Sequence, residues 1–373
     1  MSLPAPARGI VRASLTHLPP SPPQPPPALD PDCERIVSLG LNEGQFGPFP
    51  AALAALEQLG ARSNRYPSRG SYLLTSALAE RLGVEPAEVV VTAGADAAIG
   101  YACQALLAPG DEVLVPWPSF PSFVRDTRVR DAVPVLVPLD EGRIDVPALV
   151  RAVTPRTKLV FLAAPNNPTG TTLAPEALAR LVAELPAHVL PILDEAYLDF
   201  MDEETRADGI EHTLRSGRAA LVLRTFSKLY GLAGLRVGYA VGPAELVDAI
   251  RKVQRGYDVS APAQVAALAS LDDPAEVHRR RAETVSARSA LIELLTERGL
   301  PPLPEPRGNF VFVDVGSGAQ ELAEGLARRG VIVQPTGPFG APHGLRITAG
   351  APEELQLLAS ALDRLEACTA EPS

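Results

Sequence analysis

Short apolar runs alternate with amphipathic segments along most of the chain. Seven of these runs predict strands, at 88–92, 112–115, 133–138, 158–164, 189–195, 219–226 and 236–241. Between them, helical spacing predicts helices at 71–82, 95–107, 145–153 and 175–184, with Asp145 as an N-cap and Pro175 as a first helical residue. Strands that alternate with helices in this way favour a mostly parallel sheet with helices on both faces.

The pattern changes after residue 243. Helical segments fill 243–298, and strands at 308–315, 331–335 and 344–350 then alternate with helices at 318–329 and 351–366. This order predicts a smaller α+β unit. The expected division is an N-terminal arm at 1–35, an N-terminal segment and large domain at 36–260, and a small C-terminal domain at 261–373. The fold class is therefore α/β, a mostly parallel sheet domain joined to a smaller α+β domain.

The arm is rich in proline, with LPPSPPQPPPALDP from residue 18 onward. This composition favours extended polyproline conformations and resists packing. We expect a flexible or surface-draped arm, and a ligand for an SH3-type domain is the alternative.

Composition excludes several classes of function. The 373 residues can form two or three domains that need neither a disulfide nor a metal to fold. A net charge of −10 argues against nucleic-acid and anionic-membrane partners. No apolar run is long enough to span a membrane, and the N-terminus lacks the apolar core of a signal peptide. Three widely spaced cysteines indicate a reducing cytoplasm, and five histidines without an H-x-x-x-H pair make a zinc enzyme unexpected.

Lysine is rare in this chain and occurs only at Lys158, Lys228 and Lys252. Chemistry that needs a side-chain amine therefore has three candidates. Lys228 follows a predicted strand and precedes a glycine-rich run, a place where a lysine can act as a Schiff-base nucleophile. The other two fit surface positions, and a surface lysine is also the alternative for Lys228.

Four further features surround this lysine in the predicted topology. TAGADAAIG (92–100) turns through glycine from a strand into a helix, where free N–H groups and the helix dipole favour an anion, although an ordinary turn has the same pattern. PNNPTG (165–170) follows a strand and carries amides able to donate a hydrogen bond. LDEAY (193–197) ends an apolar strand, so Asp194 needs a cationic partner at the sheet end. Arg236 has a guanidinium that suits a phosphate.

The order and spacing of Asn167, Asp194, Tyr197, Lys228 and Arg236 closely resemble those of fold-type-I pyridoxal-phosphate (PLP) aminotransferases. Within that group the chain most resembles the histidinol-phosphate aminotransferase branch. The matching segments are LNEGQFGPFP (41–50), NRYP (64–67), PNNPTG, DEAY, the S-K-x₇-R run that starts at Ser227, and LRITAG (345–350). The resemblance covers residues 36–366 and implies the aspartate-aminotransferase-like fold.

The resemblance also implies roles for individual residues. Lys228, Asp194 and Tyr197 would be catalytic: Lys228 would bind PLP covalently and move a proton, and Asp194 would pair with the pyridinium N–H. PLP would be bound by Tyr66, Ala95, Asp96, Phe120, Asn167, Asp194, Tyr197, Thr225, Ser227, Lys228 and Arg236. Phe120 would stack on the ring, and a core aromatic is its alternative. Tyr66 would reach the neighbouring subunit's phosphate, which implies a homodimer with shared active sites.

Arg346, Gln334 and Asn42 would bind substrate, with Arg346 clamping the α-carboxylate; a surface arginine on an edge strand is its alternative. Where Gln334 stands, histidinol-phosphate enzymes usually have an arginine that binds the substrate's phosphate. A neutral amide cannot replace that contact, so we expect a poor fit to histidinol phosphate unless another arginine, such as Arg69 or Arg255, compensates. Ala93, Ala97, Tyr257 and Asp258 also depart from the family's usual residues.

The sequence thus predicts a cytoplasmic PLP-dependent aminotransferase that moves an amino group between an amino acid and a 2-oxo acid. One alternative is a PLP-dependent lyase or cyclase of specialised metabolism that acts on a hydroxylated arginine-like amino acid, similar to capreomycidine synthase. The other is a non-catalytic regulator or scaffold with the same fold, which the intact lysine and aspartate disfavour.

Overall fold

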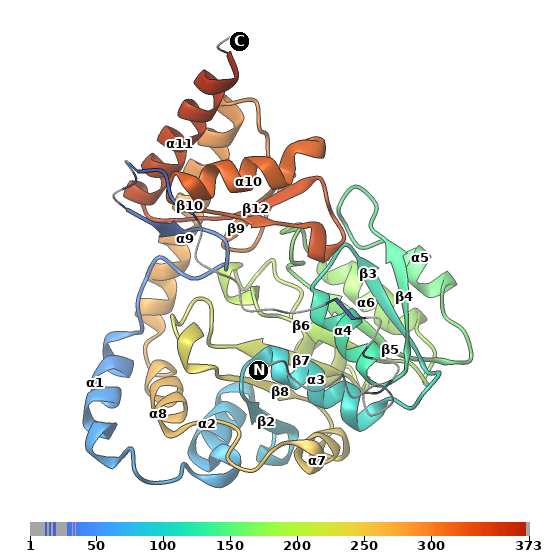
Figure 1. The fold of residues 1–373 in the computed structure, drawn as a ribbon. Helices are drawn as coiled ribbons and strands as arrows, with labels where there is room; N and C mark the ends of the chain where they lie inside the picture. Colours follow the sequence, from blue (N-terminus) through green and yellow to red (C-terminus); the bar gives the residue numbers. More distant parts are fainter. Residues whose placement is uncertain are drawn as a thin grey trace, which may run out of the picture.

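The structure is a computed structural model that describes residues 12, 15, 18, 19, 28–31, 33 and 35–370, with side chains up to 365. The expected proline-rich arm lies mostly outside the described residues. Figure 1 shows two layered parts, a large unit built on a seven-stranded sheet and a small unit built on a three-stranded sheet. Within the described part of the chain, no helix combines the length and apolar character needed to cross a bilayer.

The sheet of the large unit contains all seven strands that the sequence predicts. They are β2 (Val89–Thr92), β3 (Glu112–Trp117), β4 (Val133–Pro138), β5 (Thr157–Ala163), β6 (Leu190–Asp194), β7 (Leu221–Thr225) and β8 (Gly238–Val241), in the order β2-β8-β7-β6-β5-β3-β4. Strands β3 to β7 run parallel to one another, and β8 is antiparallel to both β2 and β7. The expected mostly parallel sheet is confirmed.

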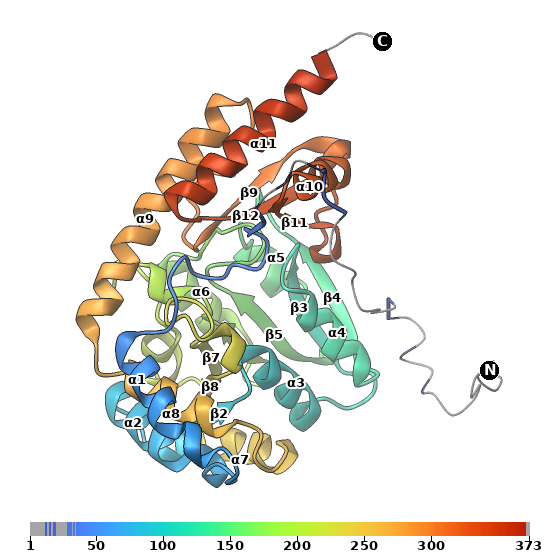
Figure 2. The same cartoon turned by 60° about the vertical axis from the view of Figure 1, so that its left-hand side comes forward.

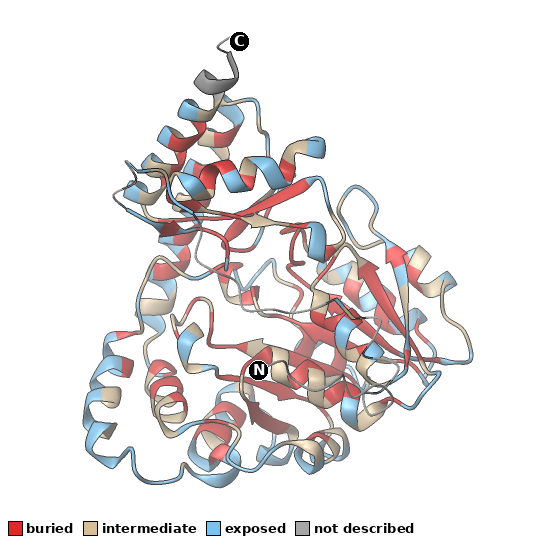
Figure 3. Cartoon of the chain, viewed as in Figure 1, coloured by how far each residue is buried: buried red, intermediate tan, exposed pale blue. Residues whose placement is uncertain are grey.

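Two apolar cores cover the two faces of this sheet. Because side chains alternate along a strand, Leu159 and Phe161 of β5 face one core, whereas Val160 and Leu162 face the other. One face is covered by α3 (Ala95–Leu106), α4 (Pro121–Val129) and α7 (Ala244–Val253). The other is covered by α1 (Pro50–Leu59), α2 (Tyr72–Leu82), α5 (Val146–Arg151), α6 (Pro175–Glu184) and α8 (Ala261–Ser270). Figure 3 shows the buried strands inside these half-exposed helices.

Local signals in the sequence placed several helix ends correctly. The Asp145 carboxylate accepts a hydrogen bond from the Ala148 N–H at 2.9 Å and so caps α5, and Pro175 is the first residue of α6. Helix α1 and the two-residue strand β1 (Val37–Ser38) were not predicted. A strand of two residues has no detectable period.

The small unit has its own apolar core. Its antiparallel sheet contains β11 (Gln334–Pro335), β12 (Gly344–Thr348) and β9 (Phe310–Asp314), and α10 (Ala319–Arg328) and α11 (Pro352–Ala370) pack against it. The single strand expected at 331–335 is in fact two strands. Its first half, β10 (Val331–Ile332), pairs with β1, and its second half pairs with β12, so the two halves have different partners.

Helices α8 and α9 and the segment around residues 37–39 pack without regard to the boundary expected at residue 261. Helix α8 follows that residue, yet its Ala263, Ala266 and Ala267 lie in a core of the large unit. The long helix α9 (Pro274–Glu297) runs along both units, and its Leu291 and Leu295 enter the small unit's core (Figure 2). Conversely, Val37 and Leu39 belong to the small unit's core although they precede the whole large unit. The domain boundaries stay a prediction.

Candidate active site

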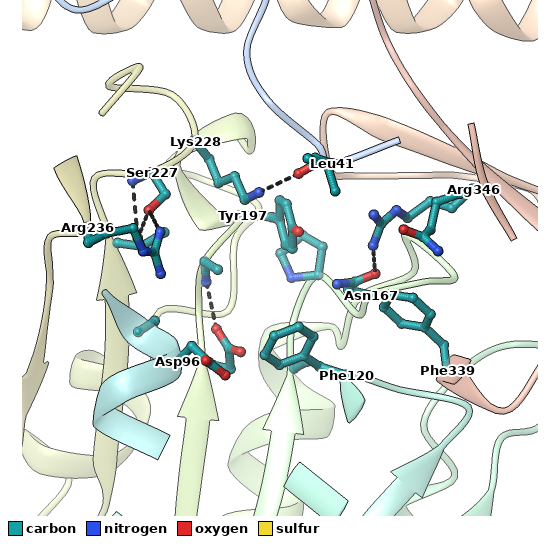
Figure 4. A pocket seen from close by; sticks show the side chains of 17 residues that line it. Leu41, Asp96, Phe120, Asn167, Tyr197, Ser227, Lys228, Arg236, Phe339 and Arg346 are labelled. Carbon is teal, nitrogen blue, oxygen red and sulfur yellow. Dashed lines mark hydrogen bonds between the residues drawn. The ribbon is translucent and has the colours of Figure 1, made fainter. Parts of the chain in front are cut away.

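A cavity of ≈ 260 Å³ opens at the carboxyl ends of β5, β6 and β7 (Figure 4). Ligands of open α/β sheets usually bind at such an edge. Every site residue named from the sequence lines it except Tyr66 and Asn42. The lining residues are Leu41, Ala95, Asp96, Phe120, Ala163, Pro165, Asn167, Asp194, Ala196, Tyr197, Thr225, Ser227, Lys228, Arg236, Gln334, Phe339 and Arg346.

Lys228 points into the cavity from the turn after β7. Its Nζ donates a hydrogen bond to the backbone carbonyl of Leu41 at 2.9 Å and lies 5.7 Å from the centre of the Tyr197 ring. Burial, followed by the charge of Arg346, lowers the pKa of Lys228 from 10.5 to about 7. A large fraction of this amine is therefore uncharged and nucleophilic at neutral pH.

Asp194 is the last residue of β6 and is 8% exposed. Its Oδ1 accepts a hydrogen bond from the Ala196 N–H at 3.1 Å, and no other described residue donates to this carboxylate. Burial raises the pKa of Asp194 to about 6, and the positive charge of Lys228 partly opposes this shift. The cationic partner expected from the sequence is thus absent among the described side chains, and Oδ2 can receive a donor from the cavity.

An anion-binding turn forms where β2 leads into α3. Gly94 has φ +91°, and a Cβ there would lie 2.8 Å from Arg236 Nη2, so only glycine lets the guanidinium approach this closely. The backbone N–H groups of Ala95 and Asp96, in the first turn of α3, donate to no acceptor among the described residues. Arg236 Nη1 donates to Ser227 Oγ at 3.4 Å. Amides, hydroxyl and guanidinium together suit a phosphate.

The side chains of Thr225 and Asp96 make contacts beside this turn. Thr225 Oγ1 accepts a hydrogen bond from the Ser227 N–H at 3.1 Å and donates to Ser227 Oγ at 3.0 Å, which fixes the serine. The Asp96 carboxylate pairs with Arg125 at 3.3 Å. Asp258, one of the departures from the family, accepts hydrogen bonds from the Ala93 N–H and from the Tyr101 hydroxyl, at 3.2 Å and 2.7 Å.

Arg346 on β12 is the cation that the small unit contributes. It is 4% exposed, donates to Asn167 Oδ1 and to the Gly40 carbonyl, and lies 5.0 Å from the centre of the Phe339 ring. Its Nε has no hydrogen-bond partner within the described part of the chain, and burial lowers the pKa of Arg346. Because Arg346 occupies Asn167 Oδ1, the Asn167 amide nitrogen remains available as a donor into the cavity.

Several lining residues were not foreseen from the sequence. Phe339 lies in a 3₁₀ turn, where no periodic pattern marks a buried aromatic. Leu41 acts through its backbone carbonyl, so no side-chain signal could reveal it. Gln334, which was named from the sequence, is directly opposite Arg346 in the β11–β12 pair, and its amide donates to the Pro335 carbonyl at 2.8 Å.

Tyr66 and Asn42 lie outside the cavity. Tyr66 is 83% exposed and stacks on Tyr257 with ring centres 4.7 Å apart. Asn42 is fully buried behind the cavity and donates to the Tyr197 hydroxyl at 2.9 Å. Arg69 and Arg255, the suggested replacements for a phosphate-binding arginine, line a different cavity beside Tyr257.

The sequence is similar to those of known aminotransferases. The family model "Aminotransferase class I and II" matches residues 34–362. The chain belongs to the class I and II aminotransferases. An aromatic amino acid aminotransferase of Mycobacterium bovis BCG is 40% identical over 320 residues, which cover 85% of this chain and 89% of that protein. A histidinol-phosphate aminotransferase of Granulibacter bethesdensis is 39% identical over 334 residues, 89% of this chain and 90% of that protein.

The solved structures agree with the sequence relatives. The histidinol-phosphate aminotransferase of Sinorhizobium meliloti, solved in complex with pyridoxal 5′-phosphate, has a TM-score of 0.88, is 28% identical, and matches over 98% of this chain and 100% of its own. An aspartate aminotransferase of Thermus thermophilus, solved as a double mutant, has a TM-score of 0.76 at 29% identity, over 89% of this chain and 91% of its own. This aminotransferase therefore has the expected fold, and the lyase or cyclase alternative gains no support.

The buried Asp194 carboxyl makes the cofactor-free protein's stability depend on pH. Its folded pKa of about 6 exceeds the ordinary 3.8, so the folded state binds more protons than the unfolded state between these values. The free energy of unfolding should therefore fall as pH rises from about 4 to 6 through this group, by at most about 3 kcal/mol. We expect Asp194→Asn to remove this pH-dependent contribution. Relative to the wild type, the variant should therefore be more stable at pH 8 than it is at pH 5.

Urea unfolding of the cofactor-free wild type and of Asp194→Asn at both pH values measures this difference. Subtracting the free energy of unfolding of one protein from that of the other cancels the contributions of all other titrating groups. Parallel pH dependence in the two proteins would show that the carboxyl ionises in the folded state at its ordinary pKa.

Proposed function

We propose that this cavity holds pyridoxal 5′-phosphate, the cofactor of this aminotransferase, and that the residues around it have the roles implied by the resemblance. Three features of the cavity fit the group. The Gly94 turn offers an anion cradle, the Asp194 Oδ2 can accept a pyridinium N–H, and Lys228 presents an amine with a pKa of about 7. Asn167 and Tyr197 face the same space with polar groups, and Phe120 offers an aromatic face.

When bound, the cofactor supplies an electron sink that makes the Cα proton of an amino acid removable. Asp194 keeps a negative charge beside the ring nitrogen and so stabilises the charge that develops as this proton leaves. Lys228 would take the proton from Cα. It would then deliver this proton to the other carbon that is bonded to the transferred nitrogen. Arg346 binds the α-carboxylate in a bidentate pair, which orients Cα toward Lys228. The amino group leaves an amino acid as a 2-oxo acid forms, and a second 2-oxo acid accepts it.

The observation that carries this function is the position of Lys228. Of the three lysines, it alone lies in the cavity, whereas the exposed Lys252 pairs with Asp248 at 2.7 Å. We propose the cytoplasm as its location, in keeping with the cysteine usage.

Reduction of the PLP-bound protein with borohydride should place the pyridoxyl label on Lys228. The uncharged fraction of this amine at pH 7.5 favours its reaction with the aldehyde, while Lys158 and Lys252 act as controls within the same chain. The measurements are loss of the visible absorption band and peptide mapping. Label on Lys158 or Lys252, or retention of the band by Lys228→Ala, would contradict the assignment.

We also infer a homodimer in which Tyr66 completes the partner's site. The support is the exposure of large side chains around it: Tyr66 is 83% exposed, Tyr72 69% and Leu73 65%. Side chains of this size gathered on one surface usually mark an interface. The Tyr66 hydroxyl would then donate to the phosphate of the neighbouring subunit.

Mixing the inactive Lys228→Ala protein with Tyr66→Phe should restore activity. Each heterodimer would contain one site with both an intact Lys228 and an intact Tyr66, so a random mixture should reach about a quarter of wild-type turnover. The measurement is activity after subunit exchange, compared with each variant alone. Tyr72→Phe replaces Tyr66→Phe in the control and should show no such gain over its own activity. A fully active monomer would exclude shared sites.

The substrate that we propose is an amino acid with an aromatic or other uncharged side chain. Relatives at 39–40% identity include both aromatic and histidinol-phosphate enzymes, so similarity alone does not choose between them. The cavity does favour one. Leu41, Phe120 and Phe339 provide apolar surface, and Gln334 offers no charge to a substrate phosphate. A buried phosphate without a cation loses several kcal/mol of pairing.

Gln334→Arg should shift the ratio of kcat/KM for histidinol phosphate over that for phenylalanine by about tenfold or more toward the phosphate ester, the scale of one charge-assisted hydrogen bond. Gln334→Leu is the matched control, because it removes the amide without adding charge and should not raise the ratio. A wild type that prefers histidinol phosphate would show that a different arginine recognises the phosphate.

A further inference from the structure

Three consecutive residues of the N-terminal segment contact three different residues of the cavity. The Gly40 carbonyl accepts from Arg346, the Leu41 carbonyl accepts from Lys228, and the Asn42 amide donates to Tyr197. We call residues 40–42 the strap. The small unit holds the strap in place, because β1 just before it pairs with β10.

Asn42 is the residue of the strap with the most restrained geometry. It has φ +53°, is fully buried, and its backbone N–H donates to Thr348 Oγ1 at 3.1 Å. Its backbone carbonyl accepts from Asn309 Nδ2 at 3.1 Å. Thr348 is in β12 and Asn309 lies just before β9, so both belong to the small unit. This unit therefore fixes the Asn42 backbone through one hydrogen bond to its N–H group and one to its carbonyl.

These contacts determine the direction of the hydrogen bond to Tyr197. Thr348 Oγ1 already accepts from the Asn42 backbone, and it donates its own hydrogen to Asn42 Oδ1 at 3.3 Å. The Asn42 amide oxygen is therefore the end that faces Thr348, and the NH₂ end faces Tyr197. Tyr197 must accept this bond, and no described residue accepts the hydrogen of its own hydroxyl. That hydrogen remains available toward the cavity.

We propose that Asn42 is a positioning residue that makes Tyr197 a hydrogen-bond donor to the cofactor's ring oxygen, and that the small unit controls this through its grip on the strap. The inference rests on the proposed function and gives Asn42 a different role from the substrate binding expected from the sequence. Tyr197 is further fixed by edge-on packing against Phe310, with ring centres 5.0 Å apart. The ring is thus held, the Asn42 amide fills one acceptor position of the hydroxyl, and Tyr197 lines the cavity toward which the hydroxyl hydrogen can point.

The consequence is measurable in the bound cofactor's absorption. A donor to the ring oxygen stabilises negative charge there and weakens the oxygen's share of the proton held between it and the linked Lys228 nitrogen. Loss of the donor should raise the pH at which this proton leaves. The charged groups that face this point are Asp194, Lys228, Arg236, Arg346 and Glu43, and the variants below leave all of them unchanged.

The test is a spectroscopic pH titration of the PLP-bound protein in a double-mutant cycle. Asn42→Gly removes the amide and keeps a residue that tolerates positive φ. It should raise the midpoint by about half a pH unit or more in the wild-type background and leave it unchanged in a Tyr197→Phe background. It should also lower kcat more than it raises KM. If Asn42→Gly fails to fold, Asn42→Ala, which also removes the amide donor and adds no charge, should show the same coupling to Tyr197.

Two outcomes would overturn the inference. Equal midpoint shifts in both backgrounds would mean that Asn42 acts on the cofactor independently of Tyr197. An unchanged midpoint with a raised KM would return Asn42 to substrate binding. A wild-type protein that binds no PLP would instead refute the proposed function, so the two failures are distinguishable.

Discussion

Burial of ionisable side chains at one edge of a parallel sheet is the constraint on which the rest of this site depends. Asp194 ends β6 and Lys228 lies in the turn after the neighbouring β7, so the sheet brings a carboxylate and an amine into the same desolvated space. Desolvation is the largest cause that moves both pKa values toward neutrality, to about 6 and about 7. Neither group has a strong partner of its own among the described side chains. The cavity is therefore poised for a ligand that provides the missing donor and the missing electrophile.

Both units contribute residues to the cavity. The large unit supplies the turn at Gly94 and the groups after β5, β6 and β7, whereas Arg346, Gln334 and Phe339 come from β11, β12 and the turn between them. The strap at 40–42 ties the two units together with hydrogen bonds to Arg346, Lys228 and Tyr197. Any movement of the small unit would therefore displace the contacts of Arg346 and of Lys228 together.

Much of the fold could be predicted because its signals are local. Each strand of the large sheet is an apolar run, and Asp145 and Pro175 mark helix starts through backbone chemistry that involves only a few neighbouring residues. The short strand at 37–38 and the division of 331–335 were missed because a pairing partner, not a pattern, defines them. Helix α8 lies in a region predicted to be helical, but the core that its small residues enter depends on contacts with distant segments.

For the site, the sequence by itself determined which chemistry is possible. A single well-placed lysine, an aspartate at a strand end and a glycine turn are properties of residue type and order, and they carried the resemblance to PLP enzymes. Only the tertiary structure decided how these residues are used. It brought the Asn42 amide to the Tyr197 hydroxyl, and it placed Phe339 and the Leu41 carbonyl at the cavity. Those outcomes depend on contacts between segments as far as 306 residues apart, such as Asn42 and Thr348, and no local pattern encodes them.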